Sequence, residues 1–191
     1  MTTNLKVVQL FQNNTELIKK AAKNNREAQH TLFEVHAPKM LSVCRYYVKD
    51  VQKAEEVMLN GFFKAFTNLN SFKNEGSFEG WLRRIIVRES ISFLRQQKEI
   101  EFSIEEIKVP NDYSITIESE LEVNDIQQLI DDLPEGYKVV FIMYAIEGYK
   151  HHEIAELLNI SEGTSKSQLF KARQYLQQKI KELNTTSYGT N

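Results

Sequence analysis

Cysteine, proline and glycine are scarce in this chain of 191 residues, which contains one, three and seven of them, respectively. The single cysteine, Cys44, excludes an intramolecular disulfide and argues against a cysteine-based metal cluster, so we expect it to be a small buried hydrophobic residue. Few prolines and glycines beside 41% hydrophobic residues favour compact helical structure over disorder. The length fits one or two small domains.

Long apolar runs and a signal sequence are missing as well. No stretch approaches about 18 uninterrupted apolar residues, and the N-terminus lacks a basic start followed by an apolar run and a small-residue cleavage site. We therefore expect a cytoplasmic protein without membrane insertion.

The sequence also lacks the motifs of enzyme chemistry. His151, His152 and Glu153 are adjacent, but they do not form the His-Glu-x-x-His spacing of a zinc site. There is no glycine loop suited to phosphate and no suggestion of a nucleophile beside a base. The sequence thus predicts that the protein is not an enzyme and has no catalytic residue, no metal and no cofactor.

The net charge is only −2, but charge is strongly divided along the chain. Residues 83–98 carry five basic side chains and one acidic side chain, a net charge of +4. Residues 99–135 carry twelve acidic and one basic, a net −11, and residues 150–181 carry six basic and three acidic, a net +3 with histidines neutral. Because patches rather than totals set the local field, the two basic blocks are compatible with nucleic-acid binding.

Helical periodicity divides the chain in a similar way. Residues 16–97 show apolar side chains at helical spacing, the acidic stretch 98–122 contains Pro110 and loses the pattern, and residues 123–183 are helical again. The predicted fold class is all-α, with two small helical domains joined by an acidic flexible linker. We expect the small polar tail from Asn184 onward to be frayed.

The C-terminal domain is predicted to contain a helix-turn-helix within Gly148 to Leu176. In the first helix, Ile154 and Leu158 recur at helical spacing. Asn159 tolerates the left-handed conformation that ends a helix, and Ser161 can cap the next helix. The polar side chains of this second helix suit phosphates and base edges. Its predicted buried face consists of Leu169, Ala172 and Leu176.

A pair of amphipathic helices joined by a polar turn is not specific to one class of protein. Such pairs occur in helical bundles that never touch nucleic acid, and repressors, response-regulator output domains and sigma factors all use the layout. An autonomous DNA-binding regulator would account for the helix-turn-helix, but it would leave the basic block at residues 83–98 and the loop from Asn68 to Gly80 unexplained.

The helix predicted over Lys53 to Leu69 has one broad apolar face, and Leu59 and Phe63 lie on the opposite side. An apolar pair with a polar border is typical of a protein-docking surface. Contact with another helix of the same domain is the alternative, and the sequence leaves both open. The polar border consists of Glu56, Asn60 and Lys64.

The segment from Asn68 to Arg95 interleaves aromatic and basic side chains, as proteins do where they hold unpaired bases beside a phosphate backbone. Trp81 also fits a helix core, so the loop residues before it are better candidates for nucleic-acid contacts. The aromatic residues are Phe72, Phe78 and Trp81, and the basic residues are Lys73, Arg83, Arg84, Arg88 and Arg95.

Three motifs together resemble one family. They are AEEVMLNGFFKAF (Ala54 to Phe66), FEGWLRRIIVRESISFLR (Phe78 to Arg95) and LPEGYKVVFIMYAIEGYKHHEIAELLNISEGTSKSQLFKAR (Leu133 to Arg173), with the acidic stretch before the third. In this order and spacing they resemble bacterial sigma factors of the extracytoplasmic-function (ECF) group, group IV of the sigma-70 family. The resemblance covers nearly the whole chain and implies a factor that directs promoter-specific transcription initiation.

The resemblance also implies a role for each domain. The first domain would dock on core RNA polymerase and melt the −10 element, and the second would read the double-stranded −35 element. An anti-sigma factor is implied as a further partner. The implied polymerase-binding residues are Glu55, Glu56, Leu59, Asn60 and Phe63. Those for the melted −10 strand are Asn70, Phe72, Lys73, Asn74, Arg83, Arg84, Arg88 and Arg95. Those for the −35 element are Ser161, Gly163, Thr164, Ser165, Lys166, Ser167, Lys171 and Arg173.

Overall fold

The computed structural model describes residues 15–97, 100, 102 and 128–188, with the backbone alone at residues 184–188. The described residues form helices and connections without a strand, which confirms the all-α class. The chain divides into two compact units, residues 1–93 and 94–191. Apart from Ile100 and Phe102, the predicted linker lies outside the described residues.

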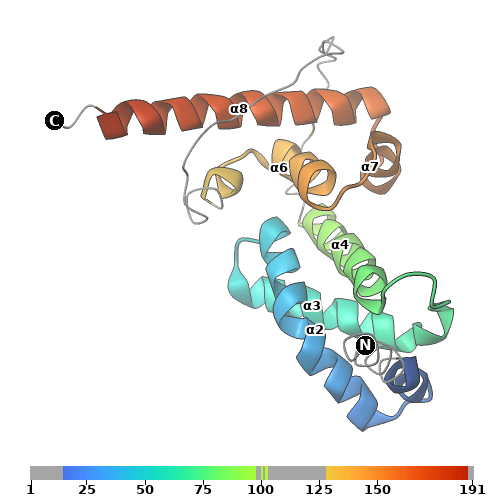
Figure 1. Ribbon diagram of the computed structural model, residues 1–191. Coiled ribbons are helices and arrows are strands. Elements are labelled where there is room, and N and C mark those ends of the chain that lie inside the picture. Colours follow the sequence, from blue (N-terminus) through green and yellow to red (C-terminus); the bar gives the residue numbers. More distant parts are fainter. Residues whose placement is uncertain (1–14, 98–99, 101, 103–127, 189–191) are drawn as a thin grey trace, which may run out of the picture. The chain divides into compact units, whose positions relative to one another are not determined.

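The first unit consists of long helices whose starts are capped by their own sequence. The Asn25 side chain accepts a hydrogen bond from the Ala28 amide at 2.9 Å, and the Asp50 side chain accepts one from the Lys53 amide, also at 2.9 Å. Each cap satisfies an amide that the first helical turn leaves free. The helices are residues 15–22, α2 (Arg26–Tyr47), α3 (Val51–Thr67), the 3₁₀ turn η1 (Leu69–Ser71) and α4 (Phe78–Gln96), whose last three residues fall in the second unit; α2, α3 and α4 are labelled in Figure 1.

Helices α3 and α4 approach closely at Gly61, because a Cβ atom built there would lie 2.4 Å from Cδ1 of Ile86. The inner face of α3 is buried as the sequence predicts. Cys44 is fully buried, as expected, and burial raises the pKa of its thiol to about 11. The buried residues of α3 are Ala54, Val57, Met58, Gly61, Phe62 and Ala65.

The second unit is built around the long helix α8, which lies beside α6 and contacts α7 (Figure 1). Helix α8 runs through Tyr188, so the prediction of a frayed tail from Asn184 is wrong for its first five residues. The described helices of this unit are residues 128–131, α6 (Glu135–Phe141), the π-helical segment η2 (Ile142–Ile146), α7 (His151–Leu158) and α8 (Glu162–Tyr188).

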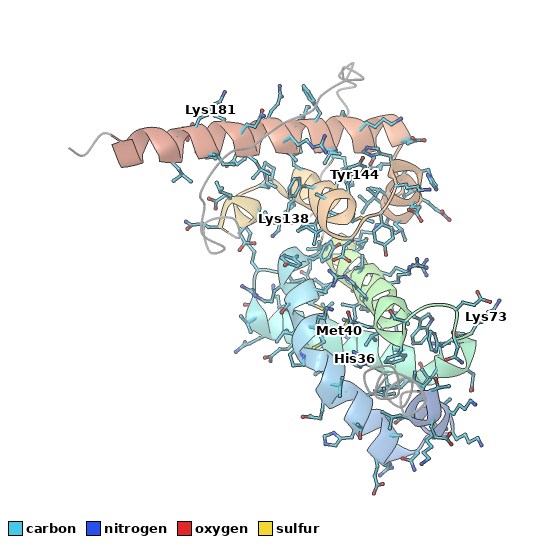
Figure 2. All side chains as sticks on the ribbon, viewed as in Figure 1. His36, Met40, Lys73, Lys138, Tyr144 and Lys181 are labelled. Atoms are coloured by element: carbon cyan, nitrogen blue, oxygen red, sulfur yellow. The ribbon has the colours of Figure 1, made fainter. Side chains whose placement is uncertain are left out.

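The core of the second unit forms where apolar side chains of α8 pack against residues 129 and 133. Ala172 and Leu176 are buried with Leu129 and Leu133, which confirms the inner face predicted for this helix. The sequence did not reveal that Lys138 on α6 is fully buried (Figure 2), with its ammonium nitrogen 3.5 Å from a carboxylate oxygen of Asp131. This ion pair connects α6 to the helix before it.

Candidate nucleic-acid interface

The turn between α7 and α8 has the backbone geometry that the sequence predicts. Asn159 ends α7 in the left-handed conformation, with φ of 55° and ψ of 49°. The amide of Thr164 donates to Oγ of Ser161 at 2.9 Å, so Ser161 caps α8. The predicted helix-turn-helix is therefore present, and the first turn of α8 is fixed by its own side chains.

The −35 candidates on α8 divide by exposure. Ser161, Gly163 and Lys166 are exposed, and Thr164, Lys171 and Arg173 are half-buried. Lys166 forms an ion pair with Glu162 at 3.1 Å on the outer side of the first turn. These residues keep their place in the candidate interface.

Two of the −35 candidates are buried. They are Ser165 and Ser167, and the neighbouring Gln168 is buried as well. The Ser167 hydroxyl donates to the Thr164 carbonyl at 2.9 Å, and the Ser165 hydroxyl lies 2.9 Å from Nδ1 of His151. Because both hydroxyls bond within the protein, DNA contacts by these two serine side chains stay a prediction that their burial does not favour.

The side chain of His151, the first residue of α7, contacts both α8 and the π-helical segment η2. Its ring stacks on Tyr144, with centroids 4.6 Å apart and planes inclined by 23°. The guanidinium of Arg173 lies 5.8 Å from the Tyr144 ring centroid. The pKa of His151 is lowered, first by burial and then by the positive charge of Lys166. Sequence reasoning missed this group, since Tyr144 is brought to His151 by a π-helical turn that regular helical spacing does not predict.

In the first unit, the loop before α4 rests on a cluster of aromatic rings. The Phe72 centroid lies 5.7 Å from that of Phe78 and 5.5 Å from that of Trp81. Phe72 is only 9% exposed, so its contact with the −10 strand stays a prediction that the position of this ring does not favour. Beneath the cluster, the ring of His36 packs edge-on against Phe78 at 5.3 Å.

The polar residues of the same loop are displayed on this aromatic base. Asn70, Lys73 and Asn74 are exposed, as expected of residues that bind nucleic acid (Figure 2, Lys73). The chain turns sharply there because Asn74 and Gly76 have positive φ angles of 59° and 93°. We call Asn70, Lys73 and Asn74 the loop tip.

The basic residues of α4 are mostly at the surface. Arg84, Arg88 and Arg95 are exposed, whereas Arg83 is half-buried. The one acidic residue among them, Glu89, forms an ion pair with Lys64 of α3. Because Lys64 neutralises Glu89, the positive charge of Arg84 and Arg88 is less offset than the sequence alone suggests.

The outer face of α3 carries two large exposed hydrophobic side chains. Leu59 is 53% and Phe63 69% exposed, and Glu55, Glu56 and Asn60 around them are exposed as well. Exposure was predicted for this face, and it favours docking of another molecule over packing within the described part of the first unit. We call these five residues the α3 docking face.

The helix-turn-helix, together with the exposed basic residues of the first unit, indicates a helical DNA-binding protein. Within the described ranges, no helix has the length and apolar character needed to cross a membrane. No group of three or more histidine, cysteine, aspartate or glutamate residues in those ranges is arranged to hold a metal ion.

Comparisons with known proteins assign the family. The model of sigma-70 region 2 matches residues 32–100, and that of sigma-70 region 4 matches residues 124–176. The RNA polymerase sigma factor SigV of Bacillus subtilis is 30% identical over 131 residues, which cover 66% of this chain and 75% of the relative. The ECF RNA polymerase sigma factor SigW of the same organism is 26% identical over 182 residues, covering 87% and 96%.

A solved structure supports the fold. The sigma factor RpoE of Bartonella quintana, crystallised with the anti-sigma factor NepR, has a TM-score of 0.51 at 18% identity. The match covers 78% of this chain and 94% of the RpoE chain.

The chain belongs to the extracytoplasmic-function group of the sigma-70 family. It is a sigma factor, which directs RNA polymerase to promoters and acts in transcription initiation.

Proposed function

We propose that the two units divide promoter recognition between them while the α3 docking face holds core RNA polymerase. The observation that carries this proposal is the exposure of Leu59 and Phe63 on a helix whose opposite face is buried. Burying two such side chains in a partner's pocket provides binding free energy, and the polar border provides orientation. An autonomous regulator would have no need for this face.

The loop tip is the part of the first unit that binds the melted −10 strand. Amide groups of Asn70 and Asn74 can hydrogen-bond the edge of an extruded base, and the Lys73 ammonium can pair with a phosphate. Removing a base from its stack costs a few kcal/mol, which the contacts at the loop tip must offset. The α4 arginines, Arg83, Arg84, Arg88 and Arg95, contact the backbone of the same strand.

The first turns of α8 bind the −35 element as duplex DNA. Lys166 is exposed beside the capped turn, and Lys171 lies further along the helix. On binding, a phosphate would compete with Glu162 for the Lys166 ammonium, because the ion pair between them is at the surface. Ser161, Gly163, Thr164 and Arg173 complete the proposed −35 surface.

Three further properties follow from this assignment. The chain acts in the cytoplasm, where it meets RNA polymerase, and it is a binding factor rather than an enzyme. An anti-sigma factor is proposed as an additional partner, since RpoE of Bartonella quintana was crystallised with one. The exposed α3 docking face would suit such a partner, which would then compete with polymerase.

Pull-down with core polymerase and run-off transcription test this proposal. Replacing Leu59 and Phe63 with glutamate should abolish stoichiometric binding to core polymerase and promoter-dependent transcripts. Val35, on α2, is 65% exposed and serves as the matched control, since Val35→Glu adds a charge at an exposed apolar site elsewhere. Normal polymerase binding by the double variant would refute the docking assignment.

A further inference from the structure

His151 connects the two helices of the helix-turn-helix by its side chain. It is the first residue of α7, and its Nδ1 atom lies 2.9 Å from Oγ of Ser165. Ser165 is fully buried and belongs to the first turns of α8, directly between Thr164 and Lys166. The hydrogen bond therefore acts on the part of α8 that carries the proposed −35 contacts.

The His151 ring is itself held from its other face. Tyr144 stacks on it at 4.6 Å, and Tyr144 comes from the π-helical segment η2. The amide of Glu147 donates to the Ile142 carbonyl at 3.0 Å, a bond that spans five residues and widens this turn. The wide turn thus contributes an aromatic wall that limits rotation of the imidazole.

The same tyrosine also contacts α8 further along its length. Arg173 lies two helical turns beyond Ser165, and its guanidinium is 5.8 Å from the Tyr144 centroid. Tyr144 and His151 therefore contact α8 at two points on one side of the helix. Two separated contacts restrict rotation and sliding of a helix, which a single contact does not.

The charges around His151 favour a neutral ring. Burial is the largest cause that lowers its pKa, the positive Lys166 and Arg173 on α8 lower it further, and Glu162 on the same helix opposes them. A neutral imidazole has one donor and one acceptor nitrogen, so it can hold the Ser165 hydroxyl in one defined arrangement.

We propose that His151 is a positioning residue for −35 recognition, which holds the first turns of α8 in register through Ser165, with Tyr144 fixing the imidazole. This inference rests on the proposed role of α8 in DNA binding. Contacts to base edges require side chains placed to within about 0.5 Å. Loss of the hydrogen bond between His151 and Ser165 should therefore lower −35 specificity more than it lowers the stability of the second unit. His151 acts through Ser165 and not by touching DNA.

The test measures −35 discrimination, the ratio of transcription from two promoter fragments by the holoenzyme. The holoenzyme is assembled from core polymerase and each variant. The probe is a promoter fragment that the wild-type holoenzyme transcribes, compared with the same fragment carrying a scrambled −35 element. His151→Ala and Ser165→Ala should each lower the preference for the intact fragment by roughly tenfold, as expected for residues coupled to a binding group. His151→Asn should restore most of it, because an amide can occupy the place of Nδ1.

A double-mutant cycle separates positioning from direct contact. If His151 acts through Ser165, the double alanine variant should lose no more discrimination than either single variant. Additive losses would instead show that His151 acts independently of Ser165, and they would overturn the proposal. The loss of −35 discrimination caused by Lys166→Ala should also be about threefold smaller in the His151→Ala background, since a misplaced Lys166 already contributes less to binding.

A neighbouring histidine provides the control for the positioning role of His151. His152 is the exposed neighbour of His151 on α7, and His152→Ala should leave discrimination unchanged. Unchanged discrimination in both His151→Ala and Ser165→Ala would contradict the positioning role while leaving the −35 assignment intact. If the wild-type holoenzyme failed to distinguish the two fragments, the proposed function of α8 itself would fall, and the two failures are therefore distinguishable.

Discussion

The two units support their proposed DNA-contact residues by different means. In the first unit the loop tip rests on the rings of Phe72, Phe78 and Trp81, which contribute buried area without strict direction. In the second unit the first turns of α8 are held by hydrogen bonds of Ser161 and Ser165, which involve few atoms and depend on geometry. The first unit should therefore be sensitive to lost volume and the second to the loss of a single oxygen atom.

The largest effect is expected from Phe72→Ala. Removing this nearly buried ring should lower the free energy of unfolding of the first unit by about 3 to 4 kcal/mol, because a cavity remains among the aromatic side chains. Urea denaturation followed by fluorescence of Trp81, the single tryptophan, measures it. Lys73→Ala, next to it in the exposed loop tip, should change stability by less than about 0.5 kcal/mol. Equal losses in the two variants would contradict the aromatic base.

Crowding the interface of α3 and α4 should have the next largest effect. Gly61→Val places a branched side chain where even a Cβ atom would lie 2.4 Å from Cδ1 of Ile86. Overpacking of this kind costs about 2 kcal/mol, and the same fluorescence experiment detects it. Asn60→Ala, one residue earlier on the exposed side, is the control and should have little effect. A valine variant as stable as the wild type would show that the two helices can separate freely.

Loss of one cap in each unit compares them directly. Ser161→Ala should destabilise the second unit by about 1 kcal/mol and also lower −35 discrimination, because Ser161 both caps the first turn of α8 and belongs to the proposed −35 surface. Asn25→Ala removes an equivalent cap from α2 and should cost about 1 kcal/mol without affecting discrimination. Circular dichroism on heating gives the stabilities, and holoenzyme binding gives the discrimination. The comparison between units breaks down if both variants impair −35 recognition equally.

A smaller effect concerns pH and the first unit. Burial lowers the pKa of His36, with Glu79 and Lys39 acting in opposite directions on it. The unfolded chain then binds more protons than the folded chain, so stability should fall as pH decreases below about 6.5. The Trp81-detected denaturation midpoint should be lower at about pH 5.5 than at about pH 7.5, a window that brackets the ordinary histidine pKa. His36→Gln should reduce this difference and His30→Gln, at an exposed site, should not.

Much of this architecture follows from the sequence where the signal is local or long. Helix α3 is amphipathic over its whole length, so the exposure of Leu59 and Phe63 is predictable from periodicity. Asn159 and Ser161 are predictable because each serves its own neighbouring backbone.

The remaining site residues depend on tertiary contacts that the sequence does not encode locally. Phe72 lies in a loop, where no period tells the inner from the outer side. Ser165 and Ser167 are small and polar, so only packing against neighbouring segments determines that they are buried. Tyr144 reaches His151 through a π-helical turn, which regular helical spacing does not predict.

Permanganate reactivity of −10 thymines in holoenzyme–promoter complexes tests most directly whether the units divide placement and strand opening. At saturating holoenzyme, the Lys73→Ala/Asn74→Ala variant should show reduced reactivity although the −35 element is occupied. The Lys166→Ala/Lys171→Ala variant should need more holoenzyme and show a shallower salt dependence, by about one unit of slope per lysine, but reach wild-type reactivity once bound. If both variants lose reactivity in the same way at saturation, the two units do not have separate tasks.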